Sequence, residues 1–451
     1  MEELIRFGEK FFDELEIAIY KNRDASVNIE LNEVSSSMLR ERAVTVIRGV
    51  KSKKLGVSIV DTGNKEKIKE AIERAYKMAK LNKPDEKWTS LPEPGKYREP
   101  RKVDKELKEV SPDYFVDLAR EGISLALEEQ GIVVAGGAGG VEWGESLIMN
   151  SHGVNVSQEG GGAFFYLELV GMREGRVTPG IFDFDAKLSL NLNVEEVVRK
   201  ALQKVKWAFN VKKSKTEEAR VILEPWAISS LLSYALFPAF SGEKLVKGTT
   251  PLANKVNESI SNELLTIYDD PLHELSINPV IADDEGVPTR KNVLVEKGVF
   301  NGFIWDNYWA KLQGVESTGN AKRSLATGGI SIGFHNVIIE KGKKSLEDLV
   351  GEIDHGYLVD GFQGAHSSNP DNGNFAVVAN PAFLIKDGEV KGSTVFMMSG
   401  NIYELLPSLY EVSKEQRVLP FEGSMIVPCL LYTSDAADEG LGVDLGGRRI
   451  I

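Results

Sequence analysis

The sequence has few of the residues that build disulfide frameworks and metal centres. It contains one cysteine, Cys429, and 5 histidines in 451 residues. A single cysteine excludes an intramolecular disulfide framework and any metal site that needs several thiolates, and the shortage of histidine leaves little material for a histidine-rich centre. Because Cys429 lies inside the apolar run Met425–Leu431, we expect it to be buried as a small hydrophobic side chain rather than to act as a thiolate.

Signals for export, membrane insertion and nucleic-acid binding are also missing. The chain begins MEELIRFGEK, without an apolar signal segment, and no run approaches the roughly 20 apolar residues of a membrane span. Acidic residues outnumber basic ones, 67 to 54, so the formal net charge is −13. This balance argues against nucleic acid or an anionic membrane as the main partner. We therefore expect a cytoplasmic protein that binds neither.

Glycine and apolar residues are abundant, and their distribution predicts an α+β fold. The 43 glycines favour turns between strands, and an apolar content of 42% is sufficient for more than one core. We expect an N-terminal α/β domain ending in a proline-rich linker, a central α/β unit, a large β-rich C-terminal domain, and a polar tail without a strand pattern. These units cover residues 1–103, 104–218, 219–431 and 432–451.

Apolar periodicity locates the individual elements. Alternation with polar residues predicts strands, and apolar residues three or four positions apart predict helices. The expected strands cover 27–31, 43–47, 56–60, 131–135, 141–150, 163–170, 220–223, 331–340, 375–379 and 383–385. The expected helices cover 68–79, 112–126 and 194–205, and a further helix begins at Pro225 and is ended or kinked by Pro238.

The helix that begins at Pro225 is the most informative element. Its apolar residues form one stripe, and it is followed by the charged segment FSGEKLVKGTTPLANKV. A helix that leads into a charged, flexible segment can form the floor and rim of a cleft. An ordinary core helix followed by a solvated loop fits the same pattern equally well.

Two further patterns suggest chemistry but have simpler explanations. Ser331 lies in a G-x-S-x-G sequence, which acts as a nucleophile elbow only at a strand–turn–helix junction, whereas the surrounding alternation predicts a strand. His355, Asp360, His366 and Asp371 could supply a metal site. The segment around them is rich in turn-forming residues, so a substrate-facing loop is the better interpretation.

With these residues in view, the chain resembles the TldD/PmbA family, and more closely its PmbA (TldE) branch. The resemblance covers residues 15 to 430, and the most specific stretches are Ser241–Val256, Tyr268–Pro271, Ser317–Arg323 and Ser368–Phe375, with Ser399–Asn401 in addition. It implies a metallopeptidase family active in the proteolysis of extended or unfolded peptides inside an enclosed chamber. The tail at 432–451 departs from the closing strand of the family, and we expect it not to be family sequence.

The resemblance also implies which residues are absent. The TldD type carries H-E-x-x-x-H on the helix before the charged segment, and a cysteine near the C-terminus, as its zinc site. In this chain Ser233 and Pro238 stand where the two histidines would be, Tyr234 replaces the glutamate, and the cysteine position falls near Glu422. None of these side chains is a good zinc ligand in that arrangement. We therefore expect no metal and no catalytic residues in this chain, with zinc in a TldD-type partner.

These expectations define one leading hypothesis and two alternatives. The leading hypothesis is a non-catalytic subunit that forms a heterodimer with a TldD-like catalytic subunit, or a homodimer, and binds peptide. Its expected cleft residues are Ser233, Lys244, Lys247, His366 and Asn374. The first alternative is a stand-alone peptide-binding or assembly protein without protease activity. The second is an autonomous hydrolase that uses Ser331 or the cluster at 355–371.

Overall fold

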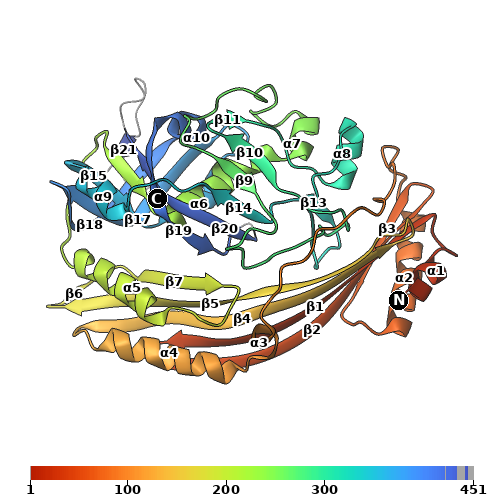
Figure 1. Ribbon diagram of the computed structural model, residues 1–451, viewed down its shortest axis with the longest axis horizontal. Helices are drawn as coiled ribbons and strands as arrows, with labels where there is room; N and C mark the ends of the chain where they lie inside the picture. Colours follow the sequence, from red (N-terminus) through yellow and green to blue (C-terminus); the bar gives the residue numbers. More distant parts are fainter. Residues whose placement is uncertain (1, 422, 434–441, 445–451) are drawn as a thin grey trace, which may run out of the picture.

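The computed structural model describes residues 2–421, 423–433 and 442–444. The chain forms two β layers. A long, curved N-terminal sheet carries helices on its outer face, and a β-rich C-terminal domain lies over its inner face (Figure 1). The mixed α+β fold with a β-rich C-terminal part is confirmed. Among the described helices, none combines the length and apolar character needed to cross a membrane.

The N-terminal sheet is built from four very long strands and three short ones. The order is β3-β2-β1-β4-β5-β6, and β7 pairs with β5. The long strands are β1 (Glu14–Glu30), β2 (Glu33–Lys51), β4 (Ile132–Asn150) and β5 (Asn155–Arg173); the short ones are β3 (Lys54–Val60), β6 (Arg176–Val177) and β7 (Ile181–Lys187). β1 pairs with β4 from end to end. Strands from both of the first two expected units therefore share one sheet.

The two faces of this sheet have different neighbours, because successive side chains point to opposite sides. Odd-numbered residues of β1, such as Ile17 and Val27, are buried in the cores beneath the outer helices. These helices are α1 (Glu2–Gly8), α2 (Lys65–Leu81), α3 (Lys105–Glu109) and α4 (Pro112–Leu127). Asn64 caps α2 and Ser111 caps α4. Even-numbered residues of β1 point toward the C-terminal domain.

The C-terminal domain contains a twelve-stranded sheet among the described residues. Its order is β11-β10-β9-β14-β20-β8-β15-β17-β18-β21, with β16 beside β17 and β19 beside β20. These strands are β8 (Arg220–Leu223), β9 (Ile267–Asp269), β10 (Asn292–Glu296), β11 (Val299–Phe300), β14 (Asn336–Ile339), β15 (His355–Val359), β16 (Phe362–Gln363), β17 (Asn374–Lys386), β18 (Glu389–Asn401), β19 (Leu409–Leu419), β20 (Ser424–Tyr432) and β21 (Gly442–Asp444). A separate hairpin joins β12 (Ala321–Arg323) and β13 (Ile330–Ile332).

The helices of the C-terminal half are mostly short. They are α5 (Val194–Ala208), α6 (Pro225–Ala235), α7 (Gly242–Lys247), α8 (Asn307–Gln313), α9 (Leu346–Gly351), α10 (Ile402–Leu405) and the 3-10 turns η1 (Phe237–Phe240), η2 (Ala365–Ser367) and η3 (Leu406–Ser408). The apolar stripe of α5 packs in one core with residues of both sheets. α6 ends at Ala235, and Pro238 lies inside η1, so the expected end of this helix is confirmed.

Three expectations about strands are corrected. The strand expected at 331–340 is two strands, β13 and β14, in different sheets. Between them the N–H of Gly333 donates to Asn320 and the N–H of His335 donates to Asp269, which turns the chain. The two runs at 131–135 and 141–150 are one strand, β4. The runs at 375–379 and 383–385 also form one strand, β17, interrupted only by a register shift between Ala379 and Ala382.

The expectation of no strand structure after residue 431 is also wrong in part. Tyr432 ends β20 and is fully buried among apolar side chains of the C-terminal core. Gly442–Asp444 pairs with Met397–Ser399 of β18, and backbone hydrogen bonds of this kind require no apolar alternation. The remaining tail residues, 434–441 and 445–451, lie outside the described residues.

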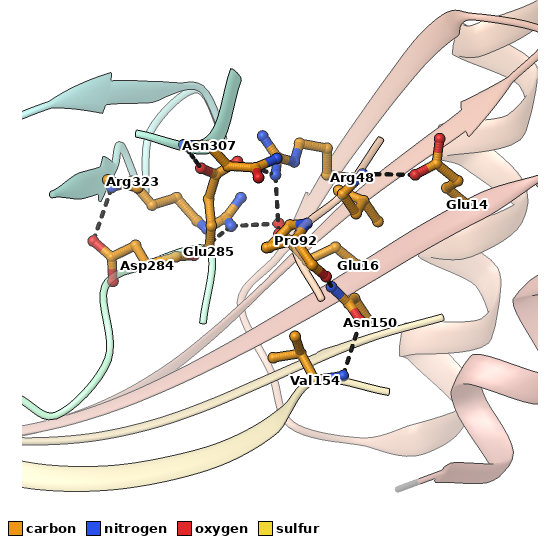
Figure 2. A network of polar contacts seen from close by, with 12 residues as sticks. Glu14, Glu16, Arg48, Pro92, Asn150, Val154, Asp284, Glu285, Asn307 and Arg323 are labelled. Atoms are coloured by element: carbon orange, nitrogen blue, oxygen red, sulfur yellow. Dashed lines mark hydrogen bonds and ion pairs between the residues drawn. The ribbon is translucent and has the colours of Figure 1, made fainter. Parts of the chain in front are cut away.

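A buried network of charged side chains joins the two layers (Figure 2). Arg48 of β2 donates to Glu16 of β1 at 3.0 Å and to Glu285 of the C-terminal domain at 2.6 Å. Arg323 of β12 donates to Glu16 from the other side. These four side chains are at most 7% exposed. Because both partners of each ion pair are buried, the network fixes the C-terminal domain against the inner face of the long sheet.

Candidate functional site

A cavity of about 910 Å³ lies between the inner face of the long sheet and the C-terminal domain. Strands β1, β4, β5 and β7 form its floor. The segment 277–284, the N-terminal end of α6 and the side chains of Lys322 and His335 form its roof. Its volume falls within the range of ligand-binding cavities.

The floor of the cavity is an ordered grid set by strand register. Asp24, Glu142 and Gly162 lie side by side on β1, β4 and β5. The next rows along the strands place Phe164 beside Ala186, and Tyr166 beside Phe184. Each row is two residues, or about 6.8 Å, from the next.

At several positions of this floor the residue is glycine, so no side chain projects into the cavity there. A Cβ built at Gly144 would have Asn22 Oδ1 at 3.4 Å as its nearest neighbour, so the space above Gly144 is open. A Cβ at Gly162 would instead lie 2.9 Å from Cβ of Ile277. The segment 277–280 therefore rests directly on β5, and the open part of the floor lies beside it on β4.

Aromatic rings line one end of the cavity. Trp226, the second residue of α6, packs edge-on against Phe182 at 4.7 Å, Phe421 at 4.9 Å and Phe184 at 5.6 Å between ring centroids. Tyr166 is 37% exposed on the same side of the floor. The rings of this aromatic end are held by one another and present apolar surface to the cavity.

Carboxylates occupy another part of the floor. Asp24 forms an ion pair with Arg40 at 2.7 Å. Glu142 lies directly opposite Asp24, and among the described residues it has no hydrogen-bond donor and no ion-pair partner. Burial and the neighbouring Asp24 raise the pKa of Glu142 above its usual value, and the more distant Arg40 opposes this effect. Glu142 is therefore an exposed carboxylate of the cavity lining, and Arg40 is the cation that acts on it.

The roof is held to the floor by specific hydrogen bonds. The hydroxyl of Tyr20 donates to Asp284 at 3.0 Å. The side-chain amide of Gln158 bridges the backbone of Ile281 and Ala282, accepting at 2.7 Å and donating at 2.9 Å. The cavity walls are thus pre-formed and do not depend on a ligand to assemble them.

The histidine in the roof is neutral and fully engaged. Burial and the nearby Lys322 ammonium lower the pKa of His335 well below its usual value. Nε2 of His335 donates to the carbonyl of Gly319 at 2.6 Å, and Nδ1 accepts from Nζ of Lys322 at 2.8 Å. Neither ring nitrogen is free to act as a base.

The residues expected at a degenerate metal site lie on and just after α6. Ser233 is buried, with its hydroxyl 3.7 Å from Sδ of Met425, while Tyr234 is 44% exposed and Pro238 lies in η1. A hydroxyl, a phenol and an imino ring do not match the imidazole, thiolate and carboxylate ligands of zinc. No group of three or more His, Cys, Asp or Glu side chains in the described part of the chain is arranged to hold a metal. Glu422, near which the cysteine position is expected, lies outside the described residues.

The other four expected cleft residues lie outside this cavity. Lys244 of α7 pairs with Asp371, and Lys247 pairs with Glu243 at 2.5 Å. The ring of His366 packs edge-on against Tyr234 at 6.4 Å, and Oδ1 of Asn374 accepts from Asn401 at 2.8 Å. None of these four side chains lines the 910 Å³ cavity. Their role as cleft residues stays a prediction.

The other sequence candidates are dispersed. Among the four polar residues at 355–371, His355 bonds Glu217 at 2.7 Å, and Asp360 is buried against Lys204 of α5 at 2.5 Å. These contacts, and those of His366 and Asp371 above, show no shared ligand site. Ser331 is exposed in the short strand β13, as the strand interpretation predicted. Cys429 is 5% exposed, and burial raises the pKa of its thiol, which confirms its apolar role.

The sequence of this chain is similar to those of known proteins, and the family it matches agrees with the two-sheet α+β fold. Sequence models of three PmbA/TldA metallopeptidase domains match the chain: domain 1 at residues 15–79, the central domain at 105–209 and the C-terminal domain at 216–435. The chain belongs to the PmbA/TldD family.

Individual relatives show which members of the family this chain resembles. The crystal structure of TldE from Thermococcus kodakarensis is 63% identical, with a TM-score of 0.95 over 98% of this chain and 99% of that one. An uncharacterized protein of Methanocaldococcus jannaschii is 30% identical over 96% of this chain and 99% of its own. A metalloprotease of the same organism is 26% identical over 77% of each chain. This chain is therefore similar both to a protein named TldE and to a protein named as a metalloprotease.

Sequence analysis did not identify the residues that line the cavity. Glu142, Tyr166 and Phe184 lie in ordinary strand patterns and are far apart in the sequence. The available signal was the density of glycine in β4 and β5, including GGAGG at 136–140 and GGG at 160–162. Glycine inside a strand indicates close approach or open space at that point.

Proposed function

We propose that this chain is the metal-free, non-catalytic subunit of a TldD/PmbA-type metallopeptidase, and that it forms part of the wall that holds an extended peptide. The observation that carries the proposal is the chemistry of α6. The helix that bears the zinc ligands in the TldD type presents Ser233, Tyr234 and then Pro238 here. Because this set cannot bind zinc or activate a water molecule, hydrolysis requires a second chain.

The cavity supports the peptide-holding part of this proposal. Its floor is part of the curved sheet and is rich in glycine, its walls combine aromatic rings with many polar and charged side chains, and its volume suits a ligand of several residues. Its walls are fixed by the network around Glu16, so little free energy of binding would be spent on ordering the site.

Metal analysis of the purified chain tests the assignment. After dialysis against a weak chelator and then excess zinc, we expect less than one-tenth equivalent of bound zinc for the chain alone. We expect about one equivalent for its complex with a TldD-type partner, together with peptidase activity that the chain alone lacks. One tightly bound zinc ion in the chain alone would contradict the proposal.

A stand-alone peptide-binding protein is the second candidate. One observation favours it: hydrogen bonds within this chain, from Tyr20 to Asp284 and from Gln158 to Ala282, hold the walls of the cavity together. The two candidates differ in complex formation. If a TldD-type protein from the same genome neither co-purifies with this chain nor gains activity from it, the stand-alone role is the better explanation.

A further inference from the structure

The cavity is lined by many acidic side chains and little basic surface. Among the described residues that line it, seven are aspartate or glutamate, one is lysine and none is arginine. The one lysine, Lys322, is directed to His335. The acidic residues come from both the floor and the roof, so a ligand in the cavity has negative charge on both sides. A cleft lined by charge of one sign attracts ligands of the opposite sign.

Two of the floor carboxylates, Glu142 and Glu168, are available to a ligand. Within the described part of the chain, neither forms a hydrogen bond or a close ion pair. Arg40, which pairs with Asp24 at 2.7 Å, acts on Glu142 only electrostatically. Glu142 is exposed and Glu168 is half-buried. Both can therefore accept hydrogen bonds from a group that enters the cavity.

Each of these two carboxylates has an aromatic ring as a neighbour. Glu168 of β5 pairs with Phe182 of β7, so the two side chains lie directly opposite each other on the floor. Glu142 pairs with Gly162, and Phe164 is the next residue on the same face of β5, which makes it a diagonal neighbour at about 7–8 Å. Phe164 and Phe182 are half-buried. Carboxylates and rings are therefore interspersed along the floor.

The guanidinium group of arginine fits such a surface better than the ammonium group of lysine does. It is planar and weakly hydrated, so it can stack on a ring and donate two hydrogen bonds to a carboxylate, whereas an ammonium is a strongly hydrated point charge. The chain contains an example beside this cavity. The guanidinium of Arg417 lies 4.8 Å from the centroid of the Phe184 ring and donates to Asp183 at 2.6 Å.

We propose that this cavity selects peptides that carry arginine side chains and disfavours peptides that carry acidic ones. Arginines of a bound peptide contact the rings of Phe164 and Phe182 and donate to Glu142 and Glu168. A glutamate in the same place is repelled by these carboxylates, because water screens charges less in a partly enclosed site than at an open surface. The inference rests on the proposed peptide-holding function and adds the class of peptide.

Binding of fluorescent peptides to the purified chain tests this inference. The probes are eight-residue peptides of glycine and serine that carry two arginines, two lysines, two citrullines or two glutamates at the same positions. Citrulline keeps the shape of arginine without its charge. We expect the arginine peptide to bind about tenfold more tightly than the citrulline peptide. The lysine peptide should lie between these two, the glutamate peptide should bind most weakly, and added salt should weaken binding of the arginine and lysine peptides alone.

Variants of the protein complete the experiment. In the double variant Glu142→Gln, Glu168→Gln, the arginine and citrulline peptides should bind nearly equally, because both available carboxylates are gone. The matched control Glu121→Gln, Glu128→Gln removes the same charge at exposed positions in and beside α4 on the outer face and should keep the preference.

The outcomes separate the two levels of the proposal. Equal binding of all four peptides to the parent chain, or a preference that the double variant keeps, would overturn this inference alone. A lysine peptide that binds as tightly as the arginine peptide would overturn the choice of arginine. Failure of every peptide to bind would overturn the peptide-holding function on which the inference rests.

Discussion

At the scale of single residues, Gly144 decides how much of the cavity floor is open. A Cβ at Gly144 would meet Asn22 Oδ1 at 3.4 Å and the carbonyl oxygen of Gly160 at 3.9 Å, and the backbone is in an ordinary extended conformation, since Gly144 is not among the glycines with positive φ. A larger side chain is therefore tolerated by the fold but occupies the space of a ligand. By contrast, Gly162 lies in contact with Ile277, where a side chain would displace the roof.

We expect Gly144→Leu to fold with an unchanged melting temperature and to bind peptide about tenfold more weakly, because the new side chain overlaps the ligand. Thermal unfolding and fluorescence anisotropy measure the two effects. Gly63→Leu, in an open loop outside the cavity, is the matched control and should bind normally. Normal peptide binding by Gly144→Leu would show that peptides bind elsewhere.

At the scale of elements, α8 is capped by a carboxylate with an unusual environment. Asp306 accepts from the N–H of Trp309 at 2.8 Å and is 2% exposed. Burial, and then the nearby Glu285, raises the pKa of Asp306 to about 7. In the unfolded chain the same carboxyl has a pKa of about 3.9. The folded protein therefore holds a proton that the unfolded chain releases between about pH 4 and pH 7, and this lowers stability as pH rises through that window.

We expect Asp306→Asn to remove this decrease in stability with rising pH, because asparagine caps a helix as well as aspartate does and carries no charge. The variant and the parent protein should have similar stability near pH 4. At pH 8 the variant should be more stable by an amount on the order of 1–3 kcal/mol. Urea unfolding across this range measures the difference. Asp104→Asn, at the exposed cap of α3, should show no such divergence, and a constant difference for Asp306→Asn would contradict the assignment.

The elements also show what local sequence could predict. Helices α2, α4 and α5 were predicted from the spacing of their apolar residues because amphipathic spacing is a local property. The predicted ends of the strands were less accurate than the predicted helices. The break between β13 and β14 depends on hydrogen bonds from Gly333 and His335 to residues outside that segment, so no local pattern could reveal it. The short strand β21 depends only on an available edge of β18.

At the scale of the whole molecule, stability depends on the charged network that joins the layers. Arg323 is fully buried and donates to Glu16, to the carbonyl of Asp284 at 2.7 Å and to the hydroxyl of Tyr20 at 3.3 Å. Removing the arginine would leave Glu16 as a buried carboxylate with only Arg48 as a partner. A buried charge that loses a partner is costly, whereas an exposed ion pair contributes little.

We expect Arg323→Met to lower the free energy of unfolding by about 3–5 kcal/mol. The matched control is Arg290→Met, which removes an exposed arginine 3.8 Å from Glu316 and should change stability by less than about 1 kcal/mol. Urea unfolding followed by tryptophan fluorescence measures both. An equally small effect for the two variants would show that the network does not hold the layers together.

The sequence by itself determined the fold class and the family resemblance, because composition, local periodicity and residue identity suffice for each, and it predicts that Ser233, Tyr234 and Pro238 replace zinc ligands. Only the tertiary structure decided where a ligand can lie. The cavity is assembled from Asp24, Glu142, Phe184 and Trp226, which are far apart in the chain and meet only when β1, β4, β5 and β7 align and the C-terminal domain covers them. Strand register sets which of the floor residues lie side by side, and register is a property of paired strands, not of either strand alone.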